Sequence, residues 1–217
     1  MIKLRAVFEK KDRAIYISHL DLNRCMLRTF RRSKLPIWYT EGFNPHPYFS
    51  FALALSLGFE SSCEILDFNL NEEIPFEQVK NQLNAVMPDG MRILTVSPQK
   101  KKITEIAKAE YRILIQSENS EDIVKAVESL MNQNEILIEK KTKKGMKTVD
   151  LKPSIELLSV RIKEDNAVIR MRLPAGTQTN YNPILFLEAL TAAYAISFET
   201  LKISRTGILC ENNKNFS

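Results

Sequence analysis

The order of secondary-structure elements predicted by the first 98 residues constrains the fold most. Residues 3–9, KLRAVFE, alternate polar and apolar side chains as a strand does. Ser18 is a good N-cap, and a helix should follow it to about Ser33, before Pro36. Two apolar stretches, 49–57 and 63–70, predict paired strands, the first of them central. A second helix should begin at Pro75, and 91–96 should form the last strand. This order is that of a ferredoxin-like (split βαβ) unit.

The rest of the chain predicts a second cycle of the same kind. A strand over 110–116 and a helix from Ser120 to about Asn132 come first, and a helix from Asn182 and a strand over 198–203 close it. Between them we expect two hairpins, 135–151 and 155–173. The sequence therefore predicts an α+β protein with two ferredoxin-like units in tandem, the second decorated with an extra hairpin. The predicted boundaries are 1–98, a linker over 99–109, a unit over 110–210 and a disordered tail over 211–217.

Composition indicates an ordinary globular protein, with 44% hydrophobic and 26% charged residues in 217. No apolar run approaches the ~20 residues that a membrane span requires. The N-terminus has no apolar segment of the kind found in secretory signals. Three widely spaced cysteines argue against disulfides or a cysteine metal site. We therefore expect a cytoplasmic protein without membrane association, bound metal or cofactor.

Positive charge is concentrated near the N-terminus. Residues 3–34 hold ten lysines and arginines against three acids, whereas residues 35–98 hold two against eight. At helical spacing Arg24, Arg28, Arg31 and Arg32 form one stripe beside the apolar face. The stripe could be a solvated surface, or it could contact a polyanion, because the arginine fork suits phosphate. The opposite charges could also neutralise one another within a folded domain.

The segment 39–51, YTEGFNPHPYFSF, is the candidate site. Pro45 and Pro47 stiffen it and push Asn44 and His46 into extended geometry, while Gly42 permits a sharp entry. It either braces a loop or presents Asn44 and His46 to a ligand. The other histidine, His19, is expected as a half-buried residue of the first helical turn. The alternative is a pocket that His19 shares with His46.

Few other patterns suggest chemistry. No glycine-rich phosphate loop or nucleophile motif occurs, and two histidines 27 positions apart lack a helical metal-ligand spacing. Cys25 could have a lowered pKa beside the arginines, although an inert thiol is the simpler interpretation.

Two further basic features are candidate contacts. The predicted hairpin tip carries Lys141, Lys143 and Lys144, a feature of nucleic-acid contacts and equally of soluble surfaces. Arg205 precedes Gly207 at a predicted strand end, where a lone arginine is more often structural than functional.

Three segments resemble a known family: SHLDLNRCMLRTFRRSKLP, YTEGFNPHPYFSFALALSLGFES with EILDF, and KTVDLKP with ISRTGIL. They are similar to the radical-SAM-linked family, a bacterial domain of unknown function (DUF2344 type). The resemblance spans nearly the whole chain, and Tyr48 departs from the small or basic residue usual there. The motif positions that it carries over, without an assigned role, are Ser18, His19, Asp21, Gly42, Asn44, Pro45, His46, Pro47, Asp150, Arg205, Thr206 and Gly207.

The resemblance implies a partner. The family's domain is fused to a B12-binding radical SAM protein or encoded separately beside one, and this chain looks like the separate form. It has no CxxxCxxC motif for the cluster that radical SAM chemistry needs. Family members often lie near genes for ribosomal proteins and ribonucleases. At the level of fold, the pair of ferredoxin-like units is also similar to the repeat-RNA-processing endoribonucleases of CRISPR systems.

Three functional hypotheses follow. The first is an accessory protein that binds RNA or presents a substrate to a radical SAM partner, in tRNA or rRNA metabolism, and is not an enzyme on its own. Its candidate contacts are Arg24, Arg28, Arg31, Arg32, Asn44, His46, Lys141, Lys143, Lys144 and Arg205. The second is a metal-independent endoribonuclease that uses His46 and His19. The third is a module that only docks the partner protein.

Overall fold

The computed structural model describes residues 1–142, 145–176 and 179–217, without the side chains of 140–142. It is a mixed α+β protein, as predicted, with four α-helices in the described ranges. The chain forms two compact units, residues 1–105 with 215–217, and residues 106–214. None of the helices in these ranges is both long and apolar enough to cross a membrane.

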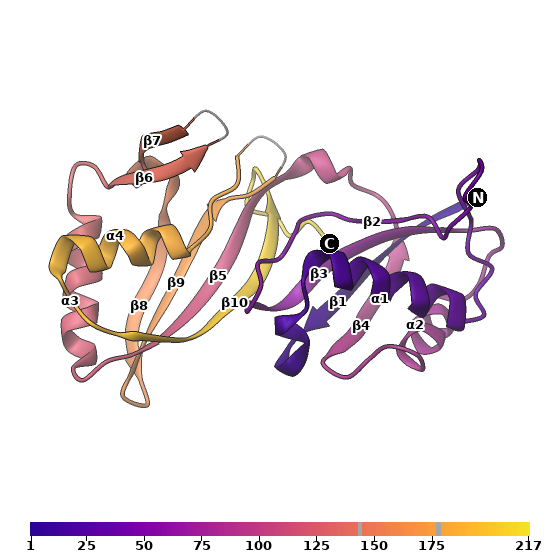
Figure 1. Ribbon diagram of the computed structural model, residues 1–217, viewed down its shortest axis with the longest axis horizontal. Coiled ribbons are helices and arrows are strands. Elements are labelled where there is room, and N and C mark those ends of the chain that lie inside the picture. Colours follow the sequence, from indigo (N-terminus) through magenta and orange to yellow (C-terminus); the bar gives the residue numbers. More distant parts are fainter. Residues whose placement is uncertain (143–144, 177–178) are drawn as a thin grey trace. The chain divides into compact units, whose positions relative to one another are not determined.

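The first unit is an antiparallel sheet with two helices on one side (Figure 1). Its elements are β1 (Ile2–Lys10), α1 (His19–Arg32), β2 (Phe49–Phe51), β3 (Glu60–Leu70), α2 (Phe76–Asn84) and β4 (Met91–Pro98). The strand order is β4-β1-β3, and β2 pairs with β3 on the side away from β1. Short 3-10 turns occupy Asp12–Tyr16 and Ile103–Glu105.

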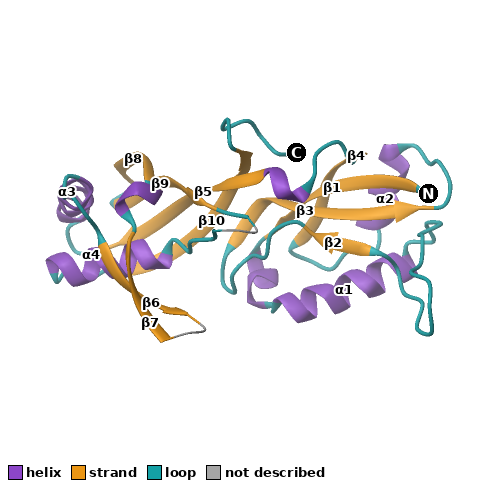
Figure 2. Ribbon diagram, turned by 90° about the horizontal axis from the view of Figure 1, so that it is seen from above, coloured by secondary structure: helices purple, strands orange, loops and turns teal. Residues whose placement is uncertain are grey.

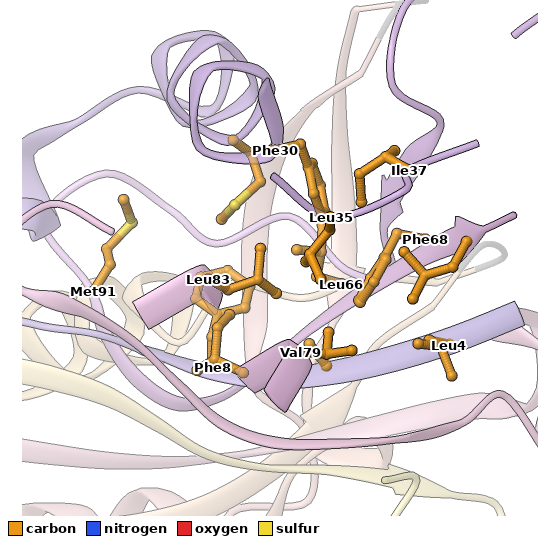
Figure 3. Close-up of a cluster of buried hydrophobic side chains, with 14 of the residues drawn as sticks. Leu4, Phe8, Phe30, Leu35, Ile37, Leu66, Phe68, Val79, Leu83 and Met91 are labelled. Atoms are coloured by element: carbon orange, nitrogen blue, oxygen red, sulfur yellow. The ribbon is translucent and has the colours of Figure 1, made fainter. Parts of the chain in front are cut away.

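The core of this unit lies between the sheet and its helices. Alternate residues of β1 and β3, such as Leu4 and Phe68, point to the helices and meet Phe30 of α1 and Leu83 of α2 (Figure 3). Burial of these apolar side chains contributes roughly 1.5–3 kcal/mol each. The other face of the sheet is thereby left for polar residues.

The second unit repeats the order of elements around an inserted hairpin. Its elements are β5 (Ile106–Gln116), α3 (Ser120–Met131), β6 (Leu137–Thr142), β7 (Gly145–Asp150), β8 (Glu156–Lys163), β9 (Asn166–Pro174), α4 (Ile184–Tyr194) and β10 (Glu199–Cys210). Strands pair antiparallel in the order β10-β5-β9-β8. Strands β6 and β7 form a separate two-stranded sheet, which projects beside α4 in Figure 2.

Two predicted segments differ from the structure. The strand expected over 49–57 contains only Phe49–Phe51, and it pairs only with β3 among the described strands, so it is not central. Its apolar sequence reflects burial without strand pairing, because Leu53 and Leu55 are buried in a bent segment. The tail that we expected to be disordered ends in a buried aromatic, Phe216, whose ring lies 4.2 Å from the guanidinium of Arg5.

Candidate nucleic-acid interface

The start of α1 is fixed by the capping arrangement that the sequence predicts. The Ser18 hydroxyl accepts a hydrogen bond from the Asp21 backbone N–H at 3.1 Å and donates one to the Asp21 carboxylate at 2.7 Å. Arg24 contacts the same carboxylate at 3.1 Å. The hydrogen bonds from Ser18 and Arg24 lower the pKa of Asp21. Ser18 and Asp21 therefore have a structural role in this motif.

All four predicted arginines lie on the solvent face of α1. The helix buries Leu22, Met26, Thr29 and Phe30, and at 100° per residue the arginines fall on the opposite side. Arg24, Arg28, Arg31 and Arg32 are exposed. We call this surface the arginine face. Leu20, an apolar residue of the first turn of α1, is 59% exposed.

The arginines of this face differ in their partners. Arg24 pairs with Asp21, and Arg32 donates a hydrogen bond to the Val86 carbonyl at 2.8 Å. In the described ranges Arg28 and Arg31 have neither an ion-pair nor a hydrogen-bond partner. Two guanidinium groups are thus available to an anion.

The segment with the two prolines is the return arm of a hairpin, residues 38–48, which we call the aromatic hairpin. The Tyr48 N–H donates to the Trp38 carbonyl at 3.0 Å, and the Thr40 N–H donates to the His46 carbonyl at 2.9 Å. The Trp38 ring meets the Tyr48 ring edge-on, with centroids 5.5 Å apart. The backbone N–H of Trp38 also donates a hydrogen bond to the backbone carbonyl of Asn69, at the end of β3. The hairpin is therefore anchored in the first unit.

The tip of the aromatic hairpin carries exposed groups. Phe43 is fully exposed at 112%, beside Gly42, whose φ of +117° suits glycine. Asn44 is exposed, and its carbonyl oxygen lies 3.0 Å from His46 Nδ1. Because a carbonyl can only accept, this contact favours the tautomer with the proton on Nδ1 and the lone pair on Nε2.

The two histidines are not brought together. The His19 ring packs against Phe51 at 5.5 Å, whereas Phe30, three turns along α1, packs against Phe49 at 5.4 Å. The chain from 51 back to 46 therefore runs toward the C-terminal end of α1, away from His19. The geometry does not support a shared acid–base pair of His46 and His19.

Arg205 needs correction as a surface contact. It is 1% exposed, so it is not available to RNA or to a partner at the surface. The reason is strand alternation, because Ile203, two residues earlier in β10, is also buried. Nearby in the motif, Thr206 Oγ1 donates to the Glu110 carbonyl at 3.4 Å.

The lysine hairpin is described only in part. Lys141 lies in β6, but its side chain, and the whole of Lys143 and Lys144, lie outside the described residues. At the base of this hairpin Asp150 accepts hydrogen bonds from the backbone N–H groups of Ile136 and Lys152, at 2.8 and 2.9 Å. Asp150 therefore holds the hairpin base in place.

Cys25 does not become reactive through its neighbours. Burial raises the pKa of its thiol, and the charges of Arg32 and Arg28 oppose this only in part. The inert interpretation fits the structure. In the described part of the chain, histidine, cysteine and acidic residues do not form a group of three that could hold a metal ion.

Charged residues within the sheets were missed by sequence reasoning. On the face of β1 away from the helices, Arg5 binds Asp67 of β3 through Nε at 2.7 Å and Nη2 at 2.8 Å. Gln99 donates to the same carboxylate, and Phe216 covers the guanidinium. In the second unit, Arg112 of β5 and Arg170 of β9 are the corresponding unnoticed residues. The signal was a polar residue at alternate positions of IAKAEYRILIQ and NAVIRMRLP.

These features define an α+β protein with an exposed cationic helix and a projecting aromatic hairpin. The family model of uncharacterized proteins conserved in bacteria (DUF2344) matches residues 3–183, so the chain belongs to this family. No curated protein matches it.

Two solved structures are similar over most of this chain. One is a chain of a Cbf5-Nop10-Gar1 complex, with 11% identity, a TM-score of 0.50 and coverage of 94% of this chain. The protein spans 48% of that chain, about half its length. The other is an unknown protein from Galdieria sulphuraria, with 11% identity, a TM-score of 0.27, and coverage of 92% of this chain and 96% of that one. The first likeness is one of fold.

Proposed function

We propose that this protein is an RNA-binding accessory protein that presents RNA to a B12-binding radical SAM enzyme. The observation that carries the proposal is the arginine face, where Arg28 and Arg31 are exposed and have no ion-pair partner among the described residues. Lysine and arginine side chains that only make a helix soluble commonly alternate with acidic side chains. Among the residues that the structure describes, Asp21 is the one carboxylate paired with an arginine of this face.

The arginine face has the dimensions of a phosphate contact. Residues 24 to 32 span about 12 Å along a helix that rises 1.5 Å per residue. This length covers several phosphates of a nucleic-acid strand, and each guanidinium can hold one phosphate through two hydrogen bonds.

The aromatic hairpin complements this charge. A fully exposed Phe43 on a stiff support loses little conformational entropy when it stacks on an unpaired base. The Asn44 amide and His46 Nε2 lie on the same arm and are suitable hydrogen-bonding groups for a base edge. The same exposed ring would suit a partner protein, which is the alternative that the experiment must separate.

The fold and the partner are parts of the proposal. The proposal that both units are ferredoxin-like is supported by their strand orders, β4-β1-β3-β2 and β10-β5-β9-β8, with β6 and β7 as the added hairpin. The radical SAM partner rests on the family resemblance and on the missing cluster motif. The similar chain of known structure also belongs to a multi-protein complex.

The test measures binding to tRNA and rRNA fragments at several salt concentrations. Replacing Arg28 and Arg31 by glutamine should make the slope of log affinity against log salt shallower by about 1.4–1.8, because each lost phosphate contact removes about 0.7–0.9. The matched control, Arg92→Gln with Lys125→Gln, removes two exposed charges elsewhere and should leave the slope unchanged. Salt-independent or absent RNA binding by the unmodified protein would refute the proposal.

A second measurement separates RNA binding from simple docking. Co-purification with a radical SAM protein should weaken after nuclease treatment if RNA joins the two. A complex that withstands nuclease, together with no RNA affinity, would favour the docking module.

A further inference from the structure

In the second unit one face of the sheet carries most of the polar side chains, although Val168 on this face is buried. In β5 the odd-numbered residues 109–115, and in β9 those of 167–173, are all buried, and α3 packs against β8 and β9. Alternate residues point to the opposite side. We call the side with the even-numbered residues of β5 and β9 the open face.

Strand pairing places two arginines directly opposite each other on the open face. Arg112 of β5 pairs with Arg170 of β9, and their outer neighbours in the same row are Ser204 of β10 and Ser159 of β8. The next row runs from Lys202 through Leu114 and Val168 to Arg161. These two rows hold four cations and no carboxylate.

Arg112 and Arg170 repel each other across the strand pair, and among the described residues only Arg170 has a counterion. Cβ atoms of directly opposed residues lie about 4.5–5.5 Å apart, and like charges in such pairs destabilise a sheet. Glu110, in the adjoining row, pairs with Arg170 at 2.6 Å and with Arg172 at 3.2 Å. Arg112 has no ion-pair or hydrogen-bond partner in the ranges 1–142, 145–176 and 179–217.

The cations are accessible. The side chain of Arg170 is 45% exposed, Arg161 and Lys202 are exposed, and Arg112 is half-buried. Arg112 and Arg170 lie in strands paired on both sides, Arg161 lies in the β8–β9 hairpin and Lys202 in a strand paired with β5, so the charges have fixed spacing. A half-buried, unpaired guanidinium on a rigid support is well suited to bind an anion through two hydrogen bonds.

We propose that the open face is a second RNA site, which holds phosphate groups of the backbone through Arg112, Arg170, Arg161 and Lys202. The inference rests on the proposed function, since it names a further surface for the same ligand. The two rows bear no aromatic side chain, so they bind the backbone and do not stack bases. Binding of phosphate between Arg112 and Arg170 would offset their repulsion.

The first test uses Arg112→Gln with Arg161→Gln, which leaves Arg170 paired with Glu110. The salt slope of RNA binding should become shallower by about 1.4–1.8. The thermal midpoint should equal or exceed that of the unmodified protein. Arg92→Gln with Lys125→Gln again serves as the control. If this variant keeps the full slope while the Arg28 and Arg31 variant loses part of it, the open face is not a site and the proposed function stands.

The second test is direct. Phenylglyoxal modifies accessible arginines, and mass spectrometry reports each position. Bound RNA should protect Arg112, Arg161 and Arg170 while Arg92 remains reactive. Unchanged modification of these three in the RNA complex, or protection by poly-glutamate but not by RNA, would overturn the assignment. RNA binding without salt dependence would instead refute the proposed function.

Discussion

Each unit begins with a long central strand that bears an arginine on the face away from its helices, Arg5 in β1 and Arg112 in β5. Arg5 is 3% exposed, is bound by both oxygens of Asp67, and is covered by the Phe216 ring. Arg112 is half-buried, and pairing places it opposite another arginine. An arginine on the corresponding face of the first strand therefore forms a buried ion pair in one unit, whereas in the other it lies opposite a second cation. The residue opposite the arginine therefore decides whether its charge is neutralised within the sheet.

The largest effect is expected from Asp67→Asn. The change leaves the Arg5 charge buried without its counterion, and breaking such a pair costs about 3–5 kcal/mol. Both side chains are nearly inaccessible, at 4% and 5%, so solvent screening is small. The free energy of unfolding in denaturant measures the loss. The double variant Arg5→Met with Asp67→Leu removes both charges. Its free energy of unfolding should be much closer to that of the unmodified protein. Equal losses of unfolding free energy in the two variants would contradict the unpaired buried charge as the cause of the destabilisation.

In the second unit, Glu110→Gln is expected to lower the stability of the fold and at the same time to strengthen RNA binding. The carboxylate of Glu110 is 12% exposed and serves both Arg170 and Arg172, so its loss should cost about 1–2 kcal/mol. The cost is smaller than at Asp67 because Arg170 is 45% exposed. The same change frees one cation on the open face and should strengthen RNA binding. A filter-binding titration checks this, and weaker binding by a folded variant would contradict it.

Arg112→Glu converts the open face into a copy of the first unit's pairing. A carboxylate opposite Arg170 should stabilise the fold by about 0.2–1 kcal/mol, as oppositely charged cross-strand pairs do. RNA affinity should fall at the same time. Arg112→Gln is the control. Its stability and its RNA affinity should both lie between those of Arg112→Glu and those of the unmodified protein. A destabilised variant would contradict the expected ion pair with Arg170, and unchanged RNA affinity would contradict a role of Arg112 in binding.

The features that were predicted correctly from the sequence are those that depend on the periodicity of polar and apolar residues. The order of elements, the Ser18 cap and the exposure of the arginine face follow from spacing along one helix or strand. The opposed arginines depend on register between distant strands, which spacing does not specify. Arg112 and Arg170 are 58 positions apart, and each lies in a segment that the sequence correctly predicts as a strand.

The burial of particular charged residues could not be predicted from the sequence either. Arg205 was a candidate contact because it precedes Gly207 at a predicted strand end, yet it is buried in β10, as a structural arginine would be. Phe216 sits in a polar tail, ENNKNFS, and its packing on Arg5 depends on a long-range contact. In the candidate site, the sequence indicated a stiff presented segment but not the hairpin tip, where Phe43 is the exposed group.

The smallest effect on stability is expected at the ion pair of Arg24 and Asp21, because both side chains are exposed. Arg24 contacts Asp21 at 3.1 Å, yet their side chains are 60% and 56% exposed, so water weakens the interaction. Hydrogen bonds from Ser18 and Arg24 lower the pKa of Asp21 in the folded state, so its carboxylate stabilises the fold above the unfolded pKa of about 4. This contribution is lost as the pH falls through the lowered folded pKa. Asp21→Asn should therefore narrow the difference in unfolding midpoint between pH 7 and pH 3, and Arg24→Gln should narrow it less, because the Ser18 hydrogen bond remains. If Arg24→Gln had the larger effect, the ion pair rather than the helix cap would govern Asp21, and exposure would matter less than pairing throughout the molecule.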